Sequence, residues 1–117
     1  LVTADGKTIY HAGDLHWWHW EGEPKADNGT MAANFKAFTE PLRGRRIDLA
    51  MVPLDGRLKE AEDWGLCCLL DLAELRTVIP MHQWEDYSPT ERFLQKHPEQ
   101  AGRILPVTQD PQSWEIP

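Results

Sequence analysis

Two short apolar segments constrain the fold of this chain more than any other feature. Residues 47–54 (IDLAMVPL) and 77–81 (TVIPM) are nearly continuous apolar runs, a pattern typical of strands that are buried on both faces of a parallel sheet. Consecutive parallel strands need a long crossover, usually a helix, and the segment between these runs is long enough for one. We therefore predict an α/β fold in which helices connect parallel strands.

The first residues predict a β-hairpin. Residues 1–3 and 7–12 consist largely of β-formers and flank the turn sequence Ala4-Asp5-Gly6, and Asp-Gly between such residues is a strong hairpin signal. Residues 13–27 are rich in aromatic residues, glycine and charge without a steady period, so we expect a long loop there.

Three helices are expected from apolar spacing and capping residues. The first spans residues 28–44, the second spans residues 58–75, and the third begins at Ser88-Pro89 and ends before Pro98. The first helix is expected to bury four side chains that recur at helical spacing, namely Met31, Phe35, Phe38 and Leu42. A last strand is expected at 103–107, and residues 1–117 are expected to form a single domain.

Composition excludes two classes of partner. The formal charge of −7 would repel a phosphate backbone, so nucleic acid is not expected as a partner. No apolar run approaches the roughly 20 residues that span a bilayer, so no membrane partner is expected either. Cys67 and Cys68 are adjacent within an apolar helical segment, where they are expected to be buried small hydrophobes. This cysteine use predicts a reducing, cytoplasmic setting.

Polar residues follow three of the predicted strands. Asp14, Asp55 and His82 each come directly after a β-forming segment, and the carboxyl ends of parallel strands gather at one edge of a sheet. Aspartate and histidine are ligands that suit zinc and similar divalent ions. The sequence therefore predicts part of a metal site at this edge.

The same segments resemble those of metallo-β-lactamase-fold enzymes. Residues 8–14 (TIYHAGD) resemble the strand and turn that carry the bridging aspartate, and residues 78–82 (VIPMH) resemble the late strand that ends in the last metal-binding histidine. Residues 47–54 resemble the strand between them. Within the superfamily, the chain is most similar to lactonase-like predicted metal-dependent hydrolases, which are related to ascorbate-phosphate lactonases.

This resemblance implies half of an αββα sandwich: an N-terminal β-hairpin followed by alternating helices and strands. It also implies a complete enzyme with two divalent ions, zinc or manganese, that hydrolyses an ester, a lactone or a phosphoester. Asp14 would bridge the ions as a catalytic residue, and His82 would complete the shell of the second ion.

One element of the family pattern is absent from the sequence. The His-x-His-x-Asp-His run, which carries the first ligands in the family, does not occur in these 117 residues. The chain thus matches the C-terminal half only, and its start without an initiator Met suggests a fragment. We expect it to bind metal weakly alone and to be inactive as an isolated chain. The alternative is a non-catalytic half-fold that associates with another chain or with itself to cover an apolar sheet face.

Four residues are expected to contact a small-molecule substrate: His16, His19, Arg57 and Trp84. Arg57 is the candidate for an anionic group. Trp17, Trp18 and Trp20 either line the substrate pocket or pack the loop, and the residues alone favour neither. A third reading of the same region is a small metal-binding module formed by His11, Asp14, His16 and His19. Asp55 is expected to hold a loop or a ligand histidine, and His97 is expected to cap a helix C-terminus.

Overall fold

The fold centres on a four-stranded mixed sheet. The computed structural model describes residues 1–105 apart from 5, 14, 21 and 82–87. Strands β1 (Val2–Ala4), β2 (Lys7–His11), β4 (Leu49–Pro53) and β6 (Val78–Met81) form the sheet in the order β1-β2-β4-β6. The hairpin strand β1 is antiparallel to β2, whereas β2, β4 and β6 are parallel to one another. The predictions of an α/β fold and an N-terminal hairpin are confirmed.

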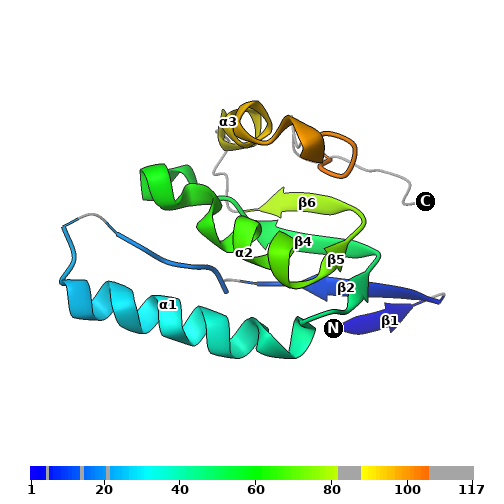
Figure 1. Cartoon of the computed structure of the whole chain (residues 1–117), viewed down its shortest axis with the longest axis horizontal. Coiled ribbons are helices and arrows are strands. Elements are labelled where there is room, and N and C mark those ends of the chain that lie inside the picture. Colours follow the sequence, from blue (N-terminus) through cyan, green and yellow to red (C-terminus); the bar gives the residue numbers. More distant parts are fainter. Residues whose placement is uncertain (5, 14, 21, 82–87, 106–117) are drawn as a thin grey trace.

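Helices connect the parallel strands. Helix α1 (Lys25–Thr39) and the 3-10 turn η1 (Glu40–Leu42) follow β2, and helix α2 (Trp64–Leu72) precedes β6. Helix α3 (Ser88–Lys96) and the turn η3 (Pro98–Gln100) follow β6. Figure 1 shows α1 and α2 running alongside the sheet and α3 above β6. No described helix is long and apolar enough to cross a membrane.

A second, smaller sheet lies beside the first. Strand β3 (Arg46–Ile47) pairs in parallel with β5 (Glu74–Leu75). The apolar run at 47–54 is therefore divided between β3 and β4, and Leu75 belongs to β5 although the apolar spacing placed it in the second helix. The strand predicted at 103–107 is reduced, within its described part, to one parallel bridge between Ile104 and Val78; residues 106–117 lie outside the described residues.

The second crossover is not one continuous helix. A 3-10 segment η2 (Gly56–Asp63) comes first, and Lys59 within it has φ 55° and ψ −119°. The α-helical part begins only at Trp64, so the helix predicted over 58–75 is too long at both ends. The apolar spacing did not reveal this break, because a 3-10 segment and the α-helix that follows it can bury side chains at similar spacings.

In the three parallel strands, whose residues are all described, one face of the sheet is more deeply buried than the other. The strand order β2-β4-β6 advances in one direction, so right-handed crossovers place their helices on the same face. That face carries the buried side chains of Tyr10, Ala50, Val52 and Val78, which join Phe35, Leu66 and Leu69 in the core. The opposite face carries partly exposed apolar side chains: Ile9, Leu49, Met51, Ile79 and Met81. The prediction that the apolar runs are buried on both faces is wrong for this second face.

Helix α1 is rotated relative to its expected orientation. Its less exposed positions are Asn28, Ala32, Phe35 and Thr39, whereas Met31 and Phe38 are 43% and 69% exposed. Residues 28, 32, 35 and 39 also have helical spacing, but only Ala32 and Phe35 among them are apolar. The predicted burial is therefore confirmed for Phe35 and Leu42 and wrong for Met31 and Phe38.

Candidate functional site

The predicted catalytic edge is formed by the ends of β2, β4 and β6. His11 is paired in register with Met51, and Pro53 with Met81, so the three parallel strands end side by side. Asp14, which follows β2, and the residues His82 and Trp84, which follow β6, lie outside the described residues. The structure thus describes the strands that lead to the predicted metal ligands, and the ligands themselves stay a prediction.

Two described polar residues at this edge already have partners. The backbone N–H of Gly13 donates to Nδ1 of His11 over 2.9 Å. Asp55 is fully buried and caps η2, since its Oδ1 accepts from the backbone N–H of Arg57 over 3.0 Å. The Arg57 guanidinium also donates to both Asp55 oxygens, with Nη2 to Oδ2 at 2.7 Å. Asp55 therefore holds a loop, one of the two roles expected for it.

Arg57 is held in place but remains accessible. Its side chain is 53% exposed, and its guanidinium lies 5.4 Å from the ring centre of Trp20. The hydrogen bonds to Asp55 raise the pKa of Arg57 above its ordinary value, so it is cationic at any physiological pH. A cation fixed between a carboxylate and an aromatic ring can attract an anionic group without changing its own position.

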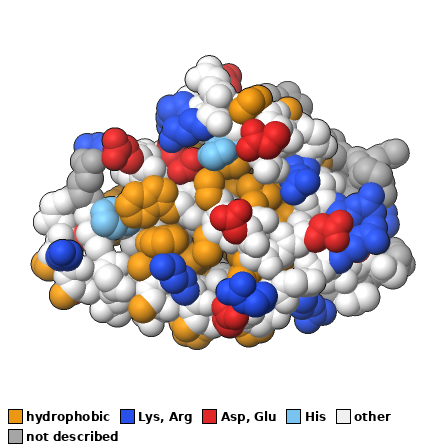
Figure 2. Space-filling view, in the orientation of Figure 1, with side chains coloured by type: hydrophobic (Ala, Val, Ile, Leu, Met, Phe, Trp, Pro, Cys, Tyr) orange, Lys and Arg blue, Asp and Glu red, His pale blue; other side chains and the backbone are white. Residues whose placement is uncertain are grey.

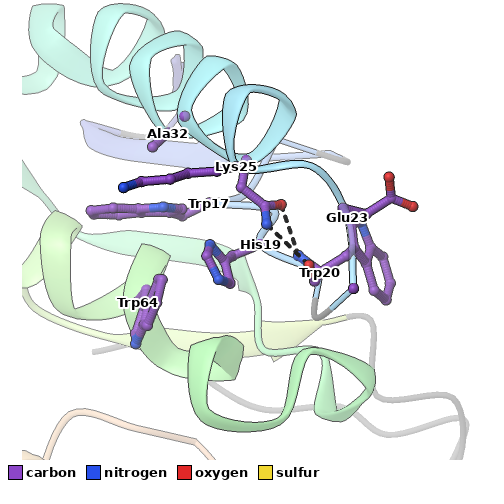
Figure 3. A pocket seen from close by; sticks show the side chains of 10 residues that line it. Trp17, His19, Trp20, Glu23, Lys25, Ala32 and Trp64 are labelled. Carbon is purple, nitrogen blue, oxygen red and sulfur yellow. Dashed lines mark hydrogen bonds between the residues drawn. The ribbon is translucent and has the colours of Figure 1, made fainter.

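The loop after β2 and the first turns of α1 and α2 enclose an aromatic pocket of about 540 Å³. Its lining includes Trp17, His19 and Trp20 from the loop, Asn28 from α1 and Trp64 from α2. Figure 3 shows the imidazole of His19 between Trp17 and Trp64, with Glu23 at the other end of the pocket. The His19 and Trp64 ring centres are 4.7 Å apart, and those of Trp17 and Trp64 are 5.6 Å apart.

A hydrogen-bond pair fixes this loop on α1. The side chain of Asn28 donates to the carbonyl of Trp20 over 3.0 Å and accepts from its backbone N–H over 3.1 Å. Both bonds are drawn in Figure 3.

Pockets of this size that are lined by aromatic rings and a few polar groups commonly bind small molecules. The two roles weighed for the tryptophans thus coincide, because Trp17 and Trp20 pack the loop and also line the pocket.

His16 and His19 occupy different environments. His16 is only 2% exposed and lies against Gly65 of α2, where an added Cβ would come within 2.6 Å of its Nδ1. It is not one of the residues that line the aromatic pocket, whereas His19 is. Close packing against Gly65 also explains why α2 has a glycine in its first turn, although glycine costs about 1 kcal/mol in a helix interior.

A second cleft, of about 510 Å³, adjoins the first. Trp17 and Trp64 line both clefts, and Cys67 and Cys68 of α2 line the second one only. Figure 2 shows hydrophobic side chains gathered on this side of the molecule, with basic side chains at their border. Both cysteines are free and pack against the core as expected, but they are only partly buried.

A group of potential metal ligands beside this cleft was not anticipated from the sequence. Asp63, Cys67 and His97 each present a ligand atom, and these atoms lie within 4.8 Å of one another. The i, i+4 spacing of Asp63 and Cys67 was a usable signal, but nothing in the sequence connected that pair to His97, thirty residues later. His97 was instead assigned to a helix cap.

Comparison of the chain with protein-family models, with curated proteins and with solved structures finds no match in any of the three.

Proposed function

We propose that this chain is the C-terminal half of a metallo-β-lactamase-type hydrolase, in which Asp14 and His82 bind part of a dinuclear metal site. The observation that carries the proposal is the order and direction of β2, β4 and β6, whose carboxyl ends are neighbours. Neighbouring strands are about 4.8 Å apart, so β2 and β6, with β4 between them, are separated by about 10 Å. An aspartate, a histidine and two ions that lie about 3.5–4 Å apart can span such a gap.

Asp14 and His82 are ligands of the right type for zinc or manganese, but two ligands are too few to hold the ions. Carboxylate oxygen and imidazole nitrogen suit both ions, yet a catalytic zinc usually takes three protein ligands. His11 and Asp55, the described polar residues closest to this edge, are engaged by Gly13 and Arg57. The remaining ligands would come from the complementary half of the fold, which carries the His-x-His-x-Asp-His run in this family.

The aromatic pocket and Arg57 are the proposed substrate-binding groups. When bound, the two ions would supply a hydroxide that is nucleophilic at neutral pH. His19 and the rings of Trp17 and Trp64 would contact the body of the substrate, and Arg57 would attract an anionic group such as a carboxylate or phosphate. The proposed reaction is hydrolysis of an ester, lactone or phosphoester.

The test is hydrolysis by the protein that contains both halves. Asp14→Ala should lower turnover of a lactone or ester panel at least a hundredfold, because outer-shell changes alone already cost 10–100-fold in affinity or activity. A chelator should inhibit the wild type, and added zinc or manganese should restore it. Glu74→Ala is the control. Glu74 is exposed and lies in β5, just before the amino end of β6, whereas the proposed site lies at the carboxyl ends of the strands. Unchanged turnover in Asp14→Ala would refute the proposal.

A second candidate function, association through the sheet, is favoured by the partly exposed apolar face. Ile9, Leu49, Met51, Ile79 and Met81 share that face, and contiguous apolar surface of this kind usually marks an interface. We propose that the complementary half of the sandwich covers it. Met51→Lys should abolish association with that half in a pull-down of purified components, whereas the control Glu74→Lys should not. Sedimentation of the chain alone would reveal self-association, and a monomer that still fails to bind the other half would refute this candidate.

A further inference from the structure

Three acidic side chains in the segment from Asp55 to Asp63 are buried, and two of them form close ion pairs. Asp55 pairs with Arg57 at 2.7 Å, and Glu62 pairs with Arg92 of α3 through two contacts of 2.8 Å. The third, Asp63, is 6% exposed. Within the described chain, Lys96 Nζ and His97 Nε2 each lie 3.8 Å from its Oδ2. Its carboxylate therefore has only a long ion pair, to Lys96, and lacks the close guanidinium partner that Asp55 and Glu62 have.

Asp63 also does not serve the helix that it precedes. It occupies the N-cap position of α2, where aspartate usually accepts a backbone N–H, but its side chain makes no capping hydrogen bond. It lies instead next to Cys67, one turn along the helix, and His97, just after α3. The Cys67 Sγ and His97 Nε2 atoms are 3.7 Å apart. Three different ligand types thus converge on one point.

We propose that Asp63, Cys67 and His97 form a binding site for one zinc ion, separate from the site assigned to Asp14 and His82. In tetrahedral zinc sites the bonds to sulfur and to nitrogen are about 2.3 Å and 2.0–2.1 Å, which places those two atoms about 3.6 Å apart. The observed sulfur–nitrogen separation of 3.7 Å fits this value. The nitrogen–oxygen separation of 3.8 Å would have to close to about 3.4 Å, and all three ligand atoms already lie within 4.8 Å of one another. The zinc–sulfur bond forms as the S–H bond breaks, and the thiol proton leaves to solvent.

The surroundings support a site that is held in place and open. The backbone N–H of His97 donates to the Phe93 carbonyl over 2.9 Å, and the His97 ring packs on the buried Phe93 ring with centres 4.9 Å apart. Cys67 lines the second cleft, which gives an ion a route to the thiol. Three protein ligands leave the fourth position to water. A bound ion would tie α2 to the end of α3.

The alternative of a nucleophilic cysteine fits the same residues less well. Burial and the carboxylates of Asp63 and Asp71 raise the pKa of Cys67 to about 11, so the thiol of the metal-free chain is protonated at neutral pH. A nucleophile has to be a thiolate before it reacts, whereas a zinc ion that binds displaces the thiol proton itself. His97 Nε2 faces both Cys67 and Asp63, and its Nδ1 lies 3.6 Å from the exposed Glu99. The imidazole does lie between a carboxylate and the thiol, but Glu99 is exposed and its 3.6 Å separation from Nδ1 is too long for the hydrogen bond that orients a catalytic histidine.

The experiment is titration of the metal-free protein with Co²⁺, followed by competition with Zn²⁺. The wild type should bind one equivalent with a thiolate-to-cobalt charge-transfer band, which Zn²⁺ removes. Cys67→Ser should abolish the band, while Cys68→Ser, which changes the neighbouring cysteine outside the cluster, should retain it. Asp14→Ala should also retain it, which separates this site from the proposed catalytic one.

Two further variants keep the test decisive if Cys67→Ser does not fold. His97→Gln keeps the thiol but should weaken Co²⁺ binding at least tenfold, because it removes one of three ligands. Lys96→Gln removes the ammonium group near Asp63 and should strengthen binding. Absence of the charge-transfer band in the wild type, or its loss in Cys68→Ser rather than in Cys67→Ser, would overturn the proposal.

Discussion

Glu62 and Asp63 are adjacent in sequence and both buried, yet they are neutralised in different ways. Glu62 is 3% exposed and meets the Arg92 guanidinium with both oxygens at 2.8 Å. Asp63 is 6% exposed and faces a thiol, an imidazole and the Lys96 ammonium group, the last two at 3.8 Å. Glu62 thus has a close guanidinium partner, whereas Asp63 has only a longer contact with an ammonium group. Both residues thus connect the start of α2 to α3. Glu62 does so through an ion pair, and Asp63 does so through groups that could bind a metal.

Removal of Arg92 should have the largest effect on this comparison. Arg92→Met keeps the apolar stem but leaves the Glu62 carboxylate buried without its partner. Because Arg92 is 45% exposed, we expect the lower part of the range for such pairs, a loss of about 2 kcal/mol in the free energy of unfolding. Urea denaturation measures it. The double variant Glu62→Gln/Arg92→Met should recover part of the loss; a fully additive cycle would show that the pair is not coupled.

Removal of Arg57 should have a smaller effect in the same direction. Arg57→Met deprives the fully buried Asp55 of its guanidinium, but Asp55 still accepts the backbone N–H of residue 57. The denaturation midpoint should therefore fall, but by less than in Arg92→Met. Arg45→Met, at an exposed position, is the control for loss of a surface cation. An equal fall in the control would contradict this reading of the Asp55 pair.

Replacement of Asp63 should sharpen the contrast between the two neighbours. Without metal, Asp63→Asn loses the 3.8 Å contacts and the hydrogen bond to the Cys67 thiol, but it also removes a buried charge. These effects oppose each other, so its free energy of unfolding should stay within about 0.5 kcal/mol of the wild type. With zinc present, the wild type should gain stability and the variant should gain less, since a ligand stabilises the state that binds it. Thermal denaturation with and without zinc measures both. A large loss in the metal-free variant would place Asp63 in the same class as Glu62.

The smallest effect at neutral pH should come from Cys67, whose titration changes the stability only at alkaline pH. Its folded-state pKa is raised from 9.0 to about 11, so between these values the folded state retains a proton that the unfolded state has lost. The corresponding stability is present below pH 9 and is lost as the pH rises to about 11. Urea denaturation across this window in metal-free buffer should show a shallower fall for Cys67→Ala than for the wild type. Identical pH slopes for the variant and the wild type would indicate that the pKa of the Cys67 thiol is not raised in the folded state.

The sequence predicted the elements better than it predicted their contacts. The Asp-Gly turn marked the hairpin, the apolar runs marked β4 and β6, and Ser88-Pro89 marked the start of α3, because these signals depend on local backbone preferences. The buried stripe of α1 was predicted only in part, since Phe35 is buried but Phe38 and Met31 are exposed although their spacing suits a helix face. Which stripe is buried depends on how the helix docks, and Asn28 lies on the docked side, where it binds the Trp20 backbone.

The candidate sites were likewise predictable from the sequence only where local patterns determine them. His19 could be placed in an aromatic loop from sequence alone, but its position between Trp17 and Trp64 requires α2 to pack beside the loop. The cluster of Asp63, Cys67 and His97 joins residues from two crossovers, and pairwise spacing cannot reveal a contact across thirty residues.

The sequence by itself determined the alternation of strands and helices, the hairpin and the absence of a His-x-His-x-Asp-His run within these residues. Only the tertiary structure decided which sheet face is covered, which carboxylates find arginines, and that His97 meets Cys67. The physical reason is range. Backbone preferences and apolar periodicity act over a few residues, whereas burial and ion pairing depend on groups that the folded chain brings together from distant positions.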